Sequence, residues 1–310
     1  MRVLRVLGRR VALGLVAAWA ILTTIFALFT LTDDWVLGEK IGRLRWGGTD
    51  EASVEAARQS YLSARGLDRP VTEVYLDWLS NMATLNWGES FQTGDPVLPT
   101  VADATVRTAT YVLPALGLAV VVGLGVGLYA ALNPQSRLTG LSLGSVYLLF
   151  AVPNFWFGGM LAAMAAAGTI PDSPLVFDHL LPILLTTTTL VGGYVSYTRA
   201  YSAEFVSTDF VRLVRAKGAD PLRVGRHVIR NAAIPVVSML FTEALALLLL
   251  TVFVIEQLFG ITGFGTTLLT AVENRDIPVL LGSTVVITAV GVVGTIVQDL
   301  SYGFLDPRVE

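Results

Sequence analysis

The chain has 310 residues, of which 54% are hydrophobic and only 15% are charged, and its mean hydropathy is +0.66. Soluble globular proteins carry about 25% charged residues, so the composition favours one polytopic membrane domain over a pair of soluble domains. The absence of cysteine excludes disulfides, thiolate metal sites and iron–sulfur clusters in this chain, and the net charge of −3 says little about partners.

Six apolar segments are each long enough to cross a bilayer as a helix, which takes about 20 residues for a core of about 30 Å. In chain order they are 11–31, 108–132, 138–167, 180–198, 235–255 and 278–297. The expected fold is therefore all-α, with six transmembrane helices.

The first apolar segment has an alternative explanation as a signal peptide. Arginines precede it, and Ala18-Trp19-Ala20 resembles a cleavage site. The apolar run continues eleven residues beyond Ala20, longer than a normal signal-peptide core, so we expect an uncleaved anchor.

The distribution of arginine predicts the orientation in the cell membrane. The N-terminus holds four arginines and no acid, and the loop 202–234 holds six basic residues against three acids. Positive residues favour the cytoplasmic side, so both are expected inside, and six spans then place the C-terminus there too. The expected parts are 1–32, with the N-terminus and first span, an external loop domain at 33–106, and a five-helix core at 107–310.

The expected external domain is too polar to enter the membrane. Its pattern predicts helices near 52–67 and 71–82, and Asp95-Pro96 and Leu98-Pro99 are expected to break regular structure before the second span. The domain is either a small cap on the outer mouth or a landing surface for an external partner, and the sequence does not decide between them.

The loop 202–234 is a basic island between two apolar segments. Residues 210–217 predict a short helix that Gly218 ends in the left-handed conformation, and Asp220 and Pro221 suit the N-cap and first position of a second helix, to about Asn231. An amphipathic element on the inner leaflet is one reading. The sharp turn favours the other, a knuckle inserted into a groove of another protein.

This island resembles the coupling loop of the permease subunits of binding-protein-dependent ABC importers, in the dipeptide/oligopeptide/nickel class. The resemblance covers nearly the whole chain, although the general importer motif is absent at 212–214. It is carried by Arg215-Ala216-Lys217-Gly218, His227-Val228-Ile229-Arg230-Asn231, Gly66-Leu67-Asp68-Arg69-Pro70, Pro153 with Phe155-Trp156, Gly263-Phe264-Gly265, and Arg275-Asp276 with Pro278.

The resemblance implies a type I importer-like bundle that forms a translocation pathway and docks an ATPase on the cytoplasmic side. The implied docking residues are Arg212, Arg215, Ala216, Lys217, Gly218, Asp220, Pro221, Arg226, His227, Arg230 and Asn231. The implied partners are a second permease subunit, two ATP-binding subunits, an external substrate-binding protein and the lipid bilayer, with no nucleic acid. ATP and Mg would bind the partner ATPase, because this chain has no phosphate-binding loop and is not itself an enzyme.

Carboxylates inside the apolar segments are costly and therefore candidates for a pathway or gate. Glu243 either lines the pathway or hydrogen-bonds a neighbour, and Glu256 and Asp299 are either conformational or solvated at the interface. Gly263 and Gly265 belong to a candidate re-entrant loop at an outer gate. No metal site is expected, since His179 and His227 fall on opposite sides of the membrane.

Two other functions compete with an ABC permease. A secondary, ion-coupled transporter usually shows internal inverted repeats, and none is visible. An intramembrane enzyme would need a paired nucleophile and base, which the apolar segments do not offer. The substrate stays open among peptides, nickel chelates and sugars, as does the choice between heterodimer and homodimer.

Overall fold

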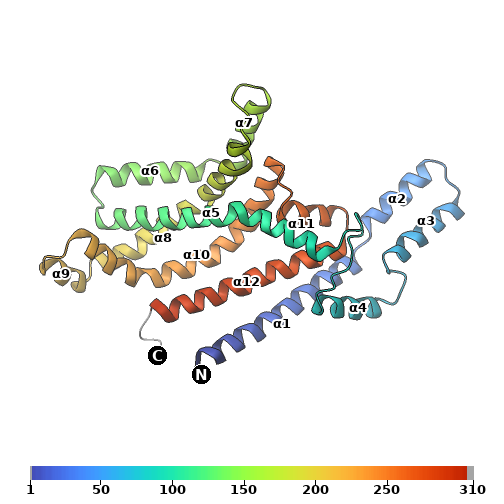
Figure 1. The fold of residues 1–310 in the computed structure, drawn as a ribbon, viewed down its shortest axis with the longest axis horizontal. Coiled ribbons are helices and arrows are strands. Elements are labelled where there is room, and N and C mark those ends of the chain that lie inside the picture. The colour runs from blue at the N-terminus through green and yellow to red at the C-terminus, as the bar shows by residue number, and fades with distance from the viewer. Residues whose placement is uncertain (1, 306–310) are drawn as a thin grey trace. The chain divides into compact units, whose positions relative to one another are not determined.

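The computed structural model describes the backbone of residues 2–305 and the side chains of residues 8–230, 232 and 250–298. Within these residues the regular structure is helical, as expected (Figure 1). The elements are α1 (Arg2–Leu31), α2 (Trp35–Trp46), α3 (Glu51–Ala64), α4 (Val71–Ala83), α5 (Val97–Leu132), α6 (Arg137–Ala151), α7 (Asn154–Ala166), the π-helix η1 (Leu175–Leu180), α8 (Leu181–Val206), α9 (Asp209–Ala216), α10 (Pro221–Phe259), α11 (Phe264–Glu273) and α12 (Ile277–Leu305).

Four helical stretches in the described part of the chain are long and apolar enough to cross a membrane. They are Gly8–Trp46, Val97–Leu132, Leu175–Val206 and Ile277–Gln298. Two further pairs qualify only when both members are taken together: α6 with α7, bent by 77°, and Leu250–Phe259 with α11, bent by 93°. This confirms a polytopic membrane fold with between four and six candidate spans.

The second span begins earlier than the sequence predicts. We expected Asp95-Pro96 and Leu98-Pro99 to keep residues before 108 irregular, but α5 starts at Val97. Proline has no N–H to offer and its φ suits the first turn of a helix, so Pro99 is tolerated there. Pro96 alone precedes the helix and marks its start.

The third predicted span, 138–167, is two helices. α6 ends at Ala151 and α7 begins at Asn154, because Val152 is extended (ψ 123°), the conformation that a following proline favours. The Asn154 amide then ties the break to α8: its Nδ2 donates to Leu185 O at 2.8 Å, and its Oδ1 accepts from Thr188 Oγ1 at 2.9 Å.

The fifth predicted span is continuous with the second helix of the basic island. We expected that helix to end near Asn231, ahead of a separate span at 235–255, but α10 runs from Pro221 to Phe259. The change from polar to apolar side chains marks a change of surroundings and does not interrupt the hydrogen bonds of the helix.

The segment between the first two spans contains three helices, of which the sequence predicted two. α3 and α4 lie where the periodicity indicates them. α2 was not predicted. Its start is set by Asp34, whose Oδ1 accepts from Leu37 N at 3.0 Å, as an N-cap does.

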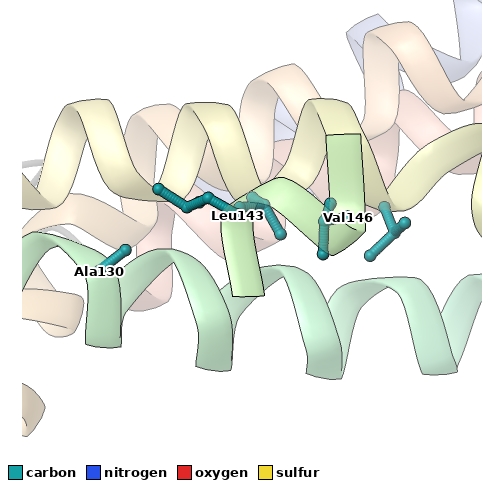
Figure 2. Close-up of a cluster of buried hydrophobic side chains, with 5 residues drawn as sticks. Ala130, Leu143 and Val146 are labelled. Atoms are coloured by element: carbon teal, nitrogen blue, oxygen red, sulfur yellow. The ribbon is translucent and has the colours of Figure 1, made fainter. Parts of the chain in front are cut away.

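The chain divides into two compact units, which are described separately. One comprises Val106–Gly265 with Val293–Glu310. In it α8 packs against α6 and α10. Figure 2 shows part of this core, where Ala130 of α5 faces Leu143 and Val146 of α6, and Val191 and Val195 of α8 complete the cluster.

The other unit comprises Met1–Thr105 with Thr266–Val292. Leu22 and Phe26 of α1 pack on Leu281 of α12, and Trp78 of α4 stacks on Phe26 with ring centroids 5.5 Å apart. Burial of these apolar side chains holds the helices of this unit together.

Two adjacent buried residues, Arg275 and Asp276, tie both ends of the segment 33–96 to the turn before α12. Arg275 Nη atoms donate to the Phe29, Thr32 and Asp33 carbonyls, the last two at 2.9 and 2.7 Å, and its Nε lies 3.4 Å from Asp34 Oδ2.

Asp276 holds the other end of the same segment. Its carboxylate accepts from Ser90 Oγ at 2.5 Å, from Phe91 N at 3.1 Å and from Gln92 N at 3.3 Å. The entry and the exit of the segment are therefore fixed by neighbouring residues of opposite charge.

Candidate functional site

The basic island folds as the sequence predicts up to the start of its second helix. α9 ends at Ala216, Gly218 has φ +77°, and Asp220 Oδ1 accepts from Arg223 N at 2.6 Å to start α10. The left-handed turn needs glycine, because a Cβ is disfavoured at positive φ. We call α9, this turn and the first three turns of α10 the knuckle (residues 209–231).

One face of the knuckle is buried. Val211 of α9 packs with Val224 and Val228 of α10, and Leu128 and Leu132 of α5 cover them. This apolar contact fixes the angle between the two short helical arms, and α5 supports it from the same unit.

The opposite face is exposed and basic. The residues that lie on it are Arg212, Arg215, Ala216, Lys217, Gly218, Asp220, Pro221, Arg226 and Arg230. Arg212 pairs with Asp209 at 3.3 Å, an exposed contact of little energetic weight. His227 is half-buried, its ring edge-on to Phe210 at 5.7 Å between centroids. The side chain of Asn231 lies outside the described residues.

This arrangement suits a protein partner. A patch of exposed guanidinium groups on a rigid elbow presents forked donors that match carboxylates of another chain. Within the described residues, the Arg215 and Arg226 side chains make no ion pair that would occupy them. The geometry brings together every predicted docking residue whose side chain is described.

A second candidate site surrounds Glu256, one turn before the end of α10. The side chain is fully buried. Its Oε1 accepts from Thr108 Oγ1 and, at 3.2 Å, from Tyr111 OH, both on α5. The same Thr108 oxygen accepts from Phe264 N at 2.7 Å, so the carboxylate and the start of α11 share one hydroxyl.

The chain turns sharply beside this carboxylate. Gly260 closes α10 with φ +64°, and the helix direction changes by 93° before α11. Arg107 of α5 donates to Thr262 Oγ1 in the turn. Residues 260–265 are thus wrapped onto Glu256 and the nearby face of α5, and we call them the Glu256 turn.

Replacing Gly263 by alanine should destabilise the Glu256 turn. An added Cβ would lie 2.6 Å from both Glu256 Cδ and Thr108 Oγ1, distances that normal packing does not allow. Overpacking of this kind costs about 1–3 kcal/mol in the free energy of unfolding, measured on the detergent-purified protein. Gly159→Ala on α7 is the control, since its Cβ would meet only Leu258 Cδ1 at 3.6 Å. Equal effects of the two changes would contradict this packing.

Glu243 and Asp299 are the other two carboxylates that the sequence predicts at a pathway or gate. The side chains of Glu243 and Asp299 lie outside the described residues. Sequence reasoning also missed Thr108 and Tyr111, the hydroxyl partners of Glu256. Their one available signal is the spacing of two hydroxyl residues one helical turn apart at the edge of an apolar segment.

More than half of the chain matches a known protein family. Residues 123–310 match the family described as "Binding-protein-dependent transport system inner membrane component". The chain is similar to the Bacillus subtilis (strain 168) "Oligopeptide transport system permease protein AppB", with 30% identity over 83% of this chain and 86% of that protein.

Two further relatives extend the range of named cargoes. "Dipeptide transport system permease protein DppB" of Bacillus subtilis (strain 168) is 29% identical over 94% of this chain and 96% of its own length. "Metal-staphylopine import system permease protein CntB" of Staphylococcus aureus (strain Mu50 / ATCC 700699) is 26% identical over 79% of both chains.

Proposed function

Because the chain belongs to the family of binding-protein-dependent transport system inner membrane components, we propose that it lines the membrane pathway of an ATP-driven importer that takes up peptides or similar small solutes. It is a transport subunit of the peptide class of ABC permeases. The observation that carries the mechanism is the exposed basic face of the knuckle, held on a fixed elbow by its apolar contacts with α5.

We assign six crossings to α1, α5, the α6–α7 pair, α8, α10 and α12. At 1.5 Å per residue, the α6–α7 pair with its 77° bend reaches about 33 Å from end to end, enough for a core of about 30 Å. Leu250–Phe259 with α11, bent by 93°, reaches only about 21 Å, which favours a re-entrant element over a seventh crossing. Six crossings and the arginine bias support a cytoplasmic location for both termini.

In this scheme two ATP-binding subunits grip the knuckle from the cytoplasm. ATP and Mg bind those subunits, and their closure moves the knuckle and with it α10. A second permease subunit completes the pathway, and an external substrate-binding protein delivers the cargo. The membrane bundle then alternates between two arrangements that ATP and the loaded receptor bias.

The Glu256 turn is our candidate for the outer gate. A buried carboxylate that joins α5, α10 and the start of α11 changes partners only when those helices move apart. Gly263 and Gly265 allow the close approach, since a Cβ at Gly263 would overlap Glu256 and one at Gly265 would lie 2.9 Å from Val252 Cγ1. Glu243 and Asp299 remain candidates for the same pathway.

The docking role is tested by cross-linking, for which the absence of cysteine is an advantage. We expect Arg215→Cys to cross-link to the ATP-binding subunit in the assembled importer, because Arg215 lies on the exposed face. Arg43→Cys, on the equally exposed α2, is the matched control and should not cross-link to that subunit. Cross-linking through both positions, or through neither, contradicts the assignment.

A further inference from the structure

A pocket of about 580 Å³ lies in the unit that comprises Met1–Thr105 with Thr266–Val292, between the end of α3 and the strand-like hairpin before α5. Arg65, Asn86, Glu89, Ser90 and Phe91 contribute to its wall. Its size is that of small-molecule sites, which run from about 300 to 1,000 Å³. Its lining residues belong neither to the knuckle nor to the Glu256 turn.

Two opposite charges line this pocket without neutralising each other. Arg65 and Glu89 make no ion pair or side-chain hydrogen bond with any residue that the structure describes. The Arg65 Nε is buried without a partner, so contacts with a ligand in the pocket fall to the two Nη groups of this half-buried side chain. A guanidinium normally directs its donors at a carboxylate, and here none is supplied by the described chain.

The guanidinium is nevertheless held in place. Its Cζ lies 3.7 Å from the centroid of the Tyr61 ring and 5.3 Å from that of Phe91. Cation–π stacking of this kind orients the plane of the group without using its N–H donors. The Nη groups are therefore held at the pocket wall and remain available to a ligand.

The stacking platform is itself anchored. Tyr61 OH donates to both Asp34 oxygens, at 3.2 and 3.1 Å, and Asp34 is paired with the buried Arg275. Burial raises the pKa of Tyr61 to about 12, so the phenol stays protonated and keeps donating at neutral pH.

The opposite wall is rigid as well. The hairpin is closed by Ser90 N to Asp95 O at 2.9 Å and by Val97 N to Gly88 O at 3.0 Å. The Asp276 carboxylate also accepts hydrogen bonds from Phe91 N and Gln92 N of this hairpin. A site whose walls are already fixed loses little conformational entropy when a ligand binds.

We propose that this pocket binds a zwitterionic ligand of the amino-acid or short-peptide class. Arg65 receives the ligand carboxylate and Glu89 the ligand ammonium, and the Asn86 amide in the same wall is a neutral partner. A ligand that carries both charges satisfies both side chains, whereas a simple anion or cation would leave one of them facing a like charge. The inference stands on the pocket and does not depend on transport or on the docking role of the knuckle.

The test is calorimetric binding to the full chain in lipid nanodiscs, with triglycine as the probe. We expect saturable binding of triglycine, and binding weaker by about tenfold for N-acetyl-triglycine and for triglycine amide, each of which lacks one charge. Arg65→Gln should weaken the binding of triglycine by about tenfold. This variant should bind triglycine and triglycine amide with equal affinity. Glu89→Gln should bind triglycine and N-acetyl-triglycine with equal affinity.

Matched controls remove one charge each elsewhere in the same unit. Arg58→Gln on α3 and Glu73→Gln on α4 should bind all three probes as the wild type does. Glu89 is exposed, so its replacement leaves folding intact even if Arg65→Gln does not fold. The proposal is overturned by the absence of saturable binding, by equal affinity for the three probes, or by wild-type affinities in Glu89→Gln.

Discussion

Replacing Gly218 by valine is expected to lower ATP-driven uptake by about tenfold to hundredfold while the protein remains in the membrane. Gly218 sits at φ +77°, where a β-branched residue is strained by about 1–3 kcal/mol, and 1.4 kcal/mol is a factor of ten. No atom lies within 4 Å of an added Cβ, so the effect comes from the backbone of the turn and not from a clash. The measurement is uptake into proteoliposomes that contain the complete importer.

Two companion variants separate docking from folding. Gly225→Ala lies in the same knuckle, but its Cβ would meet Leu128 and Leu132 at an ordinary 3.5 Å, so uptake should stay near the wild-type rate. Arg215→Glu keeps the turn and reverses the charge of the exposed face, so it should lower uptake as Gly218→Val does. Wild-type uptake in membranes that contain normal amounts of Gly218→Val would refute the role of the knuckle.

Replacing Arg275 by methionine is expected to lower the free energy of unfolding by about 3–5 kcal/mol. Its side chain is 5% exposed and that of its partner Asp34 is 16% exposed, so the change leaves a largely buried carboxylate without its countercharge and three main-chain carbonyls without their Arg275 donors. Denaturant unfolding of the detergent-purified chain measures the loss.

An exposed ion pair provides the contrast. Arg69 and Asp77 lie 2.6 Å apart but are 46% and 58% exposed, so Arg69→Met should cost less than about 1 kcal/mol. In a double-mutant cycle, adding Asp34→Asn should recover about 1–3 kcal/mol of the free energy of unfolding that Arg275→Met loses. The reason is that Asp34→Asn removes the buried carboxylate charge that Arg275→Met leaves unpaired. Similar costs for Arg275→Met and Arg69→Met would show that the buried network does not hold this unit together.

Local chemistry made the knuckle predictable. Glycine and aspartate followed by proline define a helix stop and a helix start from neighbouring residues alone, and Gly218 and Asp220 adopt those roles in the structure. The end of the second arm was predicted wrongly, because side-chain polarity and backbone continuity are different properties and only the polarity of the sequence changes near Asn231.

The candidate sites away from the knuckle depend on residues that are distant along the chain. Glu256 was recognised as an unusual carboxylate, but its partners Thr108 and Tyr111 are 148 and 145 residues away. Arg65 and Glu89 are unremarkable in sequence, and only the packing of Tyr61 and Phe91 shows that the guanidinium is held without a partner. Such contacts leave no periodic or local signal.

The continuity of α10 has a thermodynamic consequence. Its 39 residues form one helix about 58 Å long, with the docking arginines in its first turns and Glu256 in its last. A continuous helix offers one physical route for coupling between its two ends, and any such coupling is reciprocal in binding free energy. If ATP-binding subunits dock on the knuckle as proposed, a ligand that tightens the chain around Glu256 would change their affinity by the same factor by which they change its own.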